Sequence, residues 1–271
     1  MSLTSIGDVR IPSHSTRSMY LPPELISRIL KYLSDDPQSL KVMSLVSKAW
    51  TAWCQTHLFK SIRLKPSTLQ RWLKDVSPGA DSPASHTRTL TLEEYRLIPW
   101  INPRGRCVDF PPSALSSFSN TRSLSLIRWN ATLFNGASPE PYFGHFSKSL
   151  RTLSLQFCTL DLTILFDFLS LLPNVDDLDI VHPCLDLNTL ATIPNIPDAT
   201  PGFRGTLSLT NIRSEHLILK ALAALPLRFS TVKITDCIFY EHDLYQTLFT
   251  GCRDTLVTLR FEQSHWGVLR V

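Results

Sequence analysis

Residues 151–180, RTLSLQFCTLDLTILFDFLSLLPNVDDLDI, contain one complete unit of a pattern that organises most of the chain. The unit begins with Leu153 and Leu155 around one polar residue, which is the alternation of a strand with one buried face. An amphipathic stretch over residues 160–172 follows, and Pro173 ends it because proline cannot continue a helix. A second pair of apolar residues then closes the unit. The stretch therefore predicts a strand, a helix and another strand.

After residue 60, a pair of apolar residues separated by a single residue occurs eight times. The pairs are Ile62/Leu64, Leu90/Leu92, Leu124/Leu126, Leu153/Leu155, Leu178/Ile180, Leu207/Leu209, Val232/Ile234 and Leu259/Phe261. Their first members are separated by 28, 34, 29, 25, 29, 25 and 27 residues. Six of these seven intervals fit the period of about 20–29 residues that is typical of leucine-rich repeats. The pattern predicts a solenoid whose apolar pairs point inwards and whose intervening residues point outwards.

Two further amphipathic stretches, Glu215 to Leu225 and Glu241 to Cys252, lie between predicted strands and predict helices. A doubly wound α/β sheet also alternates strands with helices and is the alternative to a solenoid. Its strands are buried on both faces and are typically continuous runs of Val and Ile. The strict alternation and the short period favour an α/β solenoid with parallel strands on its concave face.

Several segments fall outside the repeating pattern. The 34-residue interval is rich in proline around Trp100 and Arg104 and predicts an extended loop. Residues 77–86, SPGADSPASH, predict a flexible hinge or surface loop, and residues 1–19 predict a disordered leader. Only ten residues, 262–271, follow the last apolar pair, too few for another helix and a cap. We therefore expect a truncated solenoid, or an end that packs against another surface.

Residues 20–60 follow a helical pattern instead. The sequence Leu-Pro-Pro-Glu at residues 21–24 starts a helix, because proline fits a first turn and an acidic residue suits its positive end. Asp36 and Ser47 precede two further short helices. The apolar stripe that predicts the buried face of the first helix consists of Leu21, Leu25, Ile29 and Leu33, widened by Ile26 and Leu30. Three short helices cannot bury all of their apolar side chains, so some must form an exposed patch.

The stretch from Leu21 to Leu64 resembles an F-box. The resemblance rests on Leu-Pro-x-Glu at residues 21–24, on Val-Ser-Lys-x-Trp at residues 46–50 and on the distance between them. The remainder resembles the degenerate leucine-rich repeats that often follow an F-box, particularly in fungal proteins. The asparagine that normally closes the strand turn is mostly absent. The expected domains are a leader (1–19), an F-box (20–64) and a leucine-rich-repeat solenoid (65–271).

This resemblance implies a non-catalytic role in ubiquitination. An F-box binds the Skp adaptor of a cullin-RING ubiquitin ligase, and the repeats hold a protein substrate. The alternative is a scaffold that binds the Skp adaptor without supporting ubiquitination. The implied adaptor-binding residues are Leu21, Pro22, Glu24, Leu25, Ile29, Leu45, Val46, Lys48 and Trp50. Trp50 is either an interface anchor or a core residue, with partial burial in both cases.

The outward-pointing strand positions form the candidate substrate surface. Most of them are small and polar, which suits a protein ligand better than a small molecule in a deep apolar pocket. The larger polar and charged members are Glu93, Gln156, Asp179, Lys233, Arg260 and Glu262. Their charges are too balanced to name a substrate.

The sequence contains no nucleophile elbow, zinc-protease helix, phosphate-binding loop or dinucleotide fingerprint. His182 and Cys184 could be metal ligands, but a zinc site needs three or four. The acidic run at residues 176–179 lacks the glycine and glutamate of a calcium loop. Cys54 could act as a nucleophile only beside a base or a positive helix end, and the sequence assigns neither. We expect no catalytic, cofactor or metal site.

Composition narrows the remaining function classes. Hydrophobic residues make up 43% of the chain and charged residues 18%, so the chain can build a core. A net charge of +4 gives no support for nucleic-acid binding. No apolar leader or long apolar run occurs, so neither secretion nor a membrane anchor is expected. Six scattered cysteines without a C-x-x-C pair fit a reduced protein of the cytoplasm, the nucleus or both.

Overall fold

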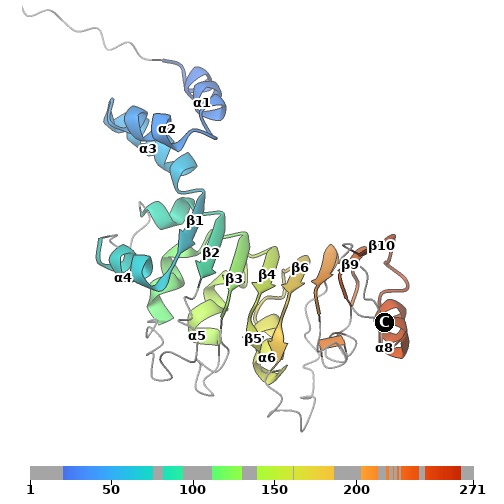
Figure 1. Cartoon of the computed structure of the whole chain (residues 1–271). Helices are drawn as coiled ribbons and strands as arrows, with labels where there is room; N and C mark the ends of the chain where they lie inside the picture. The colour runs from blue at the N-terminus through green and yellow to red at the C-terminus, as the bar shows by residue number, and fades with distance from the viewer. Residues whose placement is uncertain are drawn as a thin grey trace, which may run out of the picture.

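The computed structural model describes residues 21–75, 82–93, 112–129, 139–160, 162–185, 203–212, 227–237 and 242–263, together with residues 218, 219, 222 and 225. In this part of the chain, three helices stand at one end of a long row of strands (Figure 1). The leader, the proline-rich loop around Trp100 and the last eight residues lie outside the described residues.

The three N-terminal helices are α1 (Pro23–Tyr32), α2 (Pro37–Ser44) and α3 (Lys48–Leu58). The Asp36 carboxylate caps α2 by accepting hydrogen bonds from two backbone N–H groups at 3.1 Å. A hydrogen bond from the Ser39 hydroxyl is the largest cause that lowers the pKa of Asp36, and the two backbone hydrogen bonds lower it further. The Ser47 hydroxyl caps α3 by accepting from the N–H of Trp50 at 3.4 Å. Both predicted helix starts are confirmed.

The single buried stripe expected on α1 is wrong in detail. Ile26 and Leu30 are buried, and Leu33 is half-buried against the same small core. The other members of the stripe, Leu21, Leu25 and Ile29, are exposed. The small core also contains Leu40 and Cys54, and only one face of α1 reaches it. The apolar residues of α1 thus divide into a buried face and an exposed face.

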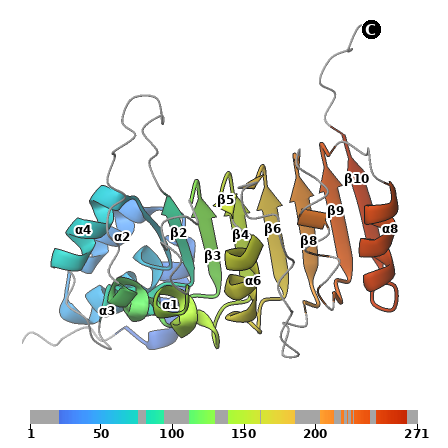
Figure 2. The ribbon, with the colours of Figure 1, turned by 90° about the horizontal axis from the view of Figure 1, so that it is seen from below.

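Eight parallel strands form one sheet whose spatial order follows the chain (Figures 1 and 2). They are β1 (Ser61–Leu64), β2 (Thr89–Glu93), β3 (Ser123–Ile127), β4 (Thr152–Gln156), β6 (Asp177–Val181), β8 (Thr206–Thr210), β9 (Thr231–Thr235) and β10 (Thr258–Glu262). Each contains one of the eight predicted apolar pairs, and the pairs are aligned in register across the sheet from Ile62 to Leu259. The α/β architecture with an eight-stranded, all-parallel, leucine-rich-repeat-like sheet is confirmed.

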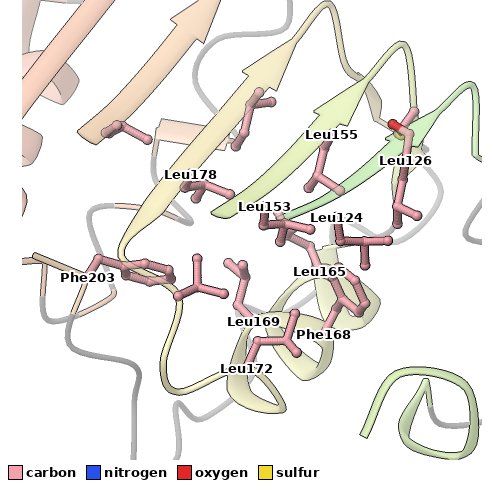
Figure 3. Packing of buried hydrophobic residues seen from close by; sticks show 14 of the residues in the cluster. Leu124, Leu126, Leu153, Leu155, Leu165, Phe168, Leu169, Leu172, Leu178 and Phe203 are labelled. Atoms are coloured by element: carbon pink, nitrogen blue, oxygen red, sulfur yellow. Dashed lines mark hydrogen bonds between the residues drawn. The ribbon is translucent and has the colours of Figure 1, made fainter. Parts of the chain in front are cut away.

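The helical connections pack against one face of the sheet. The helix predicted over residues 160–172 is α6 (Leu162–Ser170), and that predicted over residues 241–252 is α8 (His242–Gly251). In the stretch from Glu215 to Leu225, Ile218, Leu219 and Leu222 are helical and buried, and most of the others lie outside the described residues. Figure 3 shows the leucines of β3, β4 and β6 pointing towards Leu165, Phe168 and Leu169 of α6. This layer forms the core of the array.

Several connecting elements were not predicted from the sequence. They are α4 (Pro66–Asp75), α5 (Glu140–Phe143), the 3-10 helices η1 (Pro83–His86), η2 (Pro112–Phe118) and η4 (Gly144–Phe146), and the two-stranded pair β5 (Thr159–Leu160) with β7 (Cys184–Leu185). The expectation of a flexible hinge or surface loop at residues 77–86 is wrong for residues 82–86. Ser82 and Ala84 are buried there beneath the start of the array.

Five residues that directly follow strands adopt positive φ angles. They are Arg128, Phe157, His182, Asn211 and Asp236. A left-handed backbone is unfavourable for side chains such as Phe and Arg. Here it lets each backbone N–H donate to the carbonyl of the last residue of the next strand, at 2.7–3.0 Å. The hydrogen bonds repeat from unit to unit and continue the sheet into the turns.

Two cysteine thiols occupy the position where an asparagine was expected to close the strand turn. The Cys158 thiol donates to the carbonyl of Leu126 at 3.3 Å, and the Cys237 thiol donates to the carbonyl of Leu209 at 3.6 Å. Both cysteines are buried, and each links its own turn to the preceding strand. The scarcity of asparagine noted in the sequence is therefore explained at these two repeats, because cysteine replaces it.

Two residues, Phe59 and Lys60, connect α3 of the helical unit to β1 of the array. The Lys60 carbonyl accepts hydrogen bonds from the N–H groups of Arg88 and Thr89, at 2.8 and 3.0 Å. Phe59 packs on the array core and contacts Trp72, with 6.0 Å between ring centroids. Trp72 stacks in turn on Phe118 at 5.7 Å. The junction is thus a packed and hydrogen-bonded connection.

Candidate functional site

The exposed face of α1 is the first part of the candidate adaptor surface. Leu21, Leu25 and Ile29 are 39%, 45% and 36% exposed, and their spacing of four residues places them on one side of the helix. Pro22, at the N-cap, is also exposed. Glu24 lies exposed in the first helical turn. The structure therefore brings five of the predicted adaptor residues together at one end and along one face of α1.

The connection from α2 to α3 is the second part of this surface. Leu45 and Val46 form the turn between the helices and are 85% and 68% exposed. Val42, one helical turn earlier, is also exposed. Lys48 follows as an exposed residue in the first turn of α3. A turn that presents consecutive large apolar side chains to solvent is unfavourable unless another surface covers it.

Trp50 has a mixed environment, as expected. Its side chain is half-buried and packs against the small core of Ile26, Leu30, Leu40 and Cys54. It therefore contributes to the packing of the helical unit and keeps part of its ring available. Trp53, one helical turn further on, is 39% exposed.

Three exposed apolar residues of the helical unit were missed by the sequence reasoning. They are Tyr32, Val42 and Trp53. Their helical spacing from Leu25 and Ile29, from Val46 and from Trp50 was the signal that could have indicated them.

The face of the sheet opposite the helices carries the candidate substrate residues in aligned rows. One row consists of Arg63, Thr91, Ser125, Ser154, Asp179, Ser208, Lys233 and Arg260. A parallel row two residues later begins with Glu93 and ends with Glu262, and includes Gln156. All six predicted substrate residues therefore lie on this face. The six side chains differ in their exposure to solvent and in the partners that they already have.

Glu93 is almost fully covered, at 7% exposure. Its carboxylate forms an ion pair with Arg63, with 2.8 Å between Nη2 and Oε2, and a longer contact of 3.5 Å with Arg128. Two guanidinium groups compensate the buried charge. At this end of the sheet, the half-exposed Arg63 and Arg128 side chains are more accessible to a ligand than Glu93. Arg63 lies between the members of the first apolar pair, so its outward position could have been predicted.

Asp179 and Gln156 belong to a small polar network in the middle of the face. The Ser154 hydroxyl donates to the Asp179 carboxylate at 2.8 Å, and the Gln156 amide donates to Ser154 Oγ at 3.0 Å. All three residues are half-buried. The network fixes the Asp179 carboxylate in one orientation and leaves part of it open to solvent.

The last two strands carry the least compensated charges. Lys233 on β9 is directly opposite Arg260 on β10, so two cations are neighbours across the strands. Within the described part of the chain, neither forms an ion pair or a side-chain hydrogen bond. Like charges at opposed positions of a sheet are unfavourable. This end of the face therefore presents two adjacent cations, with the exposed carboxylate of Glu262 two residues further along β10.

The titratable groups of the described residues offer no activated nucleophile. Burial raises the pKa of the Cys54 thiol, which keeps it protonated and unreactive. His145 is half-buried, and this burial lowers its pKa to about 4. Within the described ranges, no group of three or more His, Cys, Asp or Glu residues could hold a metal ion. His182 instead contacts Phe157, with 5.4 Å between ring centroids. None of the described helices has the length and hydropathy to cross a bilayer.

In a comparison with protein families, residues 19–65 match an F-box-like domain. The match includes all three helices and extends through β1, the first strand of the sheet. No curated protein matches the chain. The chain therefore contains an F-box-like domain, whose last strand, β1, is also the first strand of the leucine-rich-repeat-like array described above.

Proposed function

We propose that the protein is the substrate-recognition subunit of a Skp–cullin–F-box ubiquitin ligase. The F-box-like domain binds a Skp-type adaptor, and the open face of the array holds a protein substrate. Chemistry takes place on other subunits, because the role of this chain is to hold a substrate beside a charged ubiquitin-conjugating enzyme. Tethering of this kind raises the effective concentration of the reacting groups without any catalytic residue in the receptor.

The observation that carries the proposal is the exposed apolar surface of the F-box-like domain. Leu45 and Val46 in the α2–α3 turn and Leu25 and Ile29 on α1 are exposed although the unit has its own core. Exposed apolar patches of this kind mark interaction sites. Glu24 and Lys48 at its border supply charged groups of both signs for a polar rim.

The array supports the second half of the proposal. Its open face is lined by small hydroxyl residues and a few charges, and it extends over eight strands. A broad, shallow and polar surface suits an extended protein segment. The unpaired cations Lys233 and Arg260 favour a substrate with acidic residues at that end.

Co-purification with a recombinant Skp-type adaptor tests the first half. The wild-type chain is expected to form a stable complex, and Leu45→Asp with Val46→Asp is expected to abolish it, because two charges would enter an apolar contact. Val257→Asp is the matched control: Val257 is 84% exposed but lies beside β10, at the far end of the array. Wild-type chain that never binds the adaptor would contradict the proposal.

Recruitment of the cullin separates the ligase subunit from the scaffold alternative. A ligase subunit is expected to co-purify with the cullin and to support ubiquitination of proteins trapped on the array. A scaffold would retain the adaptor and lack the cullin. Reversing the charge of Lys233, alone or together with Arg260, is expected to reduce the yield of trapped substrates identified by mass spectrometry. Adaptor binding is expected to be unchanged, because the two surfaces belong to different modules.

A further inference from the structure

A row of cations lies along the edge of the sheet at which the strands start. Because the sheet is parallel throughout, its strands all start along one edge (Figure 2). Directly before β1, β2, β3 and β4 lie Lys60, Arg88, Arg122 and Arg151, and all four are exposed. Asp176 occupies the same position before β6. The basic row therefore extends over four neighbouring strands and ends at an acidic residue.

Backbone hydrogen bonds keep the basic row aligned. The N–H of Arg88 donates to the carbonyl of Lys60, and the N–H of Arg122 to the carbonyl of Arg88, both at 2.8 Å. The N–H of Arg151 donates to the carbonyl of Arg122, also at 2.8 Å. Residues aligned in this way on neighbouring strands are about 4.8 Å apart. The row therefore extends over about 14 Å, which is the length of about four residues of an extended chain.

The positive charge of the basic row is not compensated. The segments that lead into β2, β3 and β4, residues 82–88, 112–122 and 139–151, are all described, and within the described chain none of the four side chains forms an ion pair. Arg88 donates to the carbonyl of Asn120, and Arg151 to those of Leu150 and Asn174, each at 3.1 Å. These bonds orient the two guanidinium groups without neutralising them. Like charges at neighbouring positions of a sheet are unfavourable, so an anionic ligand would relieve their repulsion.

The surroundings of the basic row favour an acidic protein segment over a nucleic acid. Proteins that bind single-stranded nucleic acids combine cations with aromatic side chains on which the bases stack. The exposed aromatic residues of the described chain, Tyr32, Trp53, Phe157 and Phe261, all lie outside the segments that lead into β1–β4. Phe59 precedes Lys60 but packs on the array core. Guanidinium groups without stacking partners suit carboxylates, which they bind through paired N–H groups.

We propose that the basic row binds an extended acidic segment of a partner protein. The Asp or Glu side chains of the segment lie along the strand-start edge and accept hydrogen bonds from Lys60, Arg88, Arg122 and Arg151. Asp176 limits the segment to the first four strands, because its carboxylate repels acidic groups beyond Arg151. Lys60 is two residues after α3, so the segment is bound beside the junction with the F-box-like domain. The inference does not rest on the proposed ubiquitin-ligase function.

Fluorescence anisotropy tests the proposal by titrating the full chain into labelled octaglutamate at low ionic strength. The wild type is expected to bind, and added salt to weaken binding by screening the exposed charges. Arg122→Glu and Lys60→Glu are each expected to weaken binding about tenfold, because an attractive contact becomes a repulsive one. In the described chain neither side chain forms a hydrogen bond, and each reversal removes repulsion within the row. Both variants should therefore melt no lower than the wild type.

Arg228→Glu is the matched control. Arg228 is exposed, lies before β9 on the far side of Asp176 and changes the net charge equally, so this variant is expected to bind octaglutamate like the wild type. Equal weakening by Arg228→Glu would show a response to net charge alone and overturn the inference, as would a wild type that does not bind. Tighter binding of octathymidylate would overturn the protein partner in favour of a nucleic acid. A chain that binds octaglutamate but not the adaptor contradicts only the ligase assignment.

Discussion

The helical unit and the strand array use their apolar residues in opposite ways. In the array, strict alternation sends the inward residues of β1 to β9 into one continuous core, and Leu90, Leu124 and Leu153 are completely buried. In the helical unit only four residues are buried, whereas Leu25, Leu45 and Val46 face solvent. The array therefore has a continuous core of its own, whereas the helical unit leaves apolar residues exposed for the adaptor contact proposed above. Periodicity identifies the first kind of region, and an excess of apolar residues over the available core identifies the second.

The largest expected effect concerns the array core. Leu153→Ala removes a completely buried side chain from the layer between β4 and α6 (Figure 3) and is expected to lower the free energy of unfolding by about 2–5 kcal/mol. Chemical denaturation measures this loss. Leu45→Ala, made at an 85% exposed position, is the control and should change stability by less than about 0.5 kcal/mol. A destabilisation as large as that of Leu153→Ala would contradict the division between the two regions.

Trp50 tests the boundary between core and interface. Trp50→Ala is expected to weaken adaptor binding by about thirtyfold or more, which is a loss of about 2 kcal/mol in binding free energy. Calorimetric titration with the adaptor and thermal melting of the same variant form a paired measurement. If Trp50 served the core alone, the change would instead cost about 3–5 kcal/mol of folding stability. Unchanged affinity with a collapsed melting temperature would remove Trp50 from the interface.

His145 gives the array a pH dependence between pH 6.5 and pH 4. Burial, the largest cause, lowers the folded pKa of His145 from 6.5 to about 4, although a hydrogen bond to the Leu115 backbone opposes the shift. Between these values the unfolded chain binds a proton that the folded chain does not. Stability should therefore fall by about 2 kcal/mol as the pH drops from 6.5 to 4. Denaturation at several pH values measures this loss, and His145→Phe should flatten the profile in that window.

The smallest expected effect is at the cap of α3. Ser47→Ala removes the hydroxyl that accepts from the Trp50 N–H and should cost about 1 kcal/mol of stability. Because Ser47 lies between Val46 and Lys48, adaptor affinity should fall slightly as the turn becomes less ordered. Ser47→Asp retains a capping oxygen and should recover most of the loss. Equal stability of the wild type and Ser47→Ala would show that the cap is unimportant.

The strands and the helix starts could be predicted, because each depends on residues that are close together in the sequence. All eight strands follow from alternation, and the starts of α2 and α3 follow from Asp36 and Ser47. The buried face of α1 could not be predicted, because Leu21/Leu25/Ile29 and Ile26/Leu30 are both compatible with helical spacing. Only the position of Leu40 and Cys54 decides between the two faces.

The candidate substrate surface was predictable in position but not in chemistry. Register alone places Glu93, Asp179 and Arg260 on the open face. The burial of Glu93 depends on Arg63 and Arg128, which are 30 and 35 residues away and meet it only in the folded sheet. The packed turn at residues 82–86 was missed for the same reason, since Ala84 is buried by elements distant in sequence.

The two-residue junction at Phe59 and Lys60 bears on the proposed receptor role. Its hydrogen bonds and ring contacts tie the residues after α3 to the first elements of the array, which restricts how the F-box-like domain can turn relative to the array. A substrate held on the array would then be presented along a single direction, and only lysines at one distance and on one side of it would reach the transferred ubiquitin. Selectivity among the lysines of a bound substrate would follow from the stiffness of this joint, in addition to the affinity of the binding face.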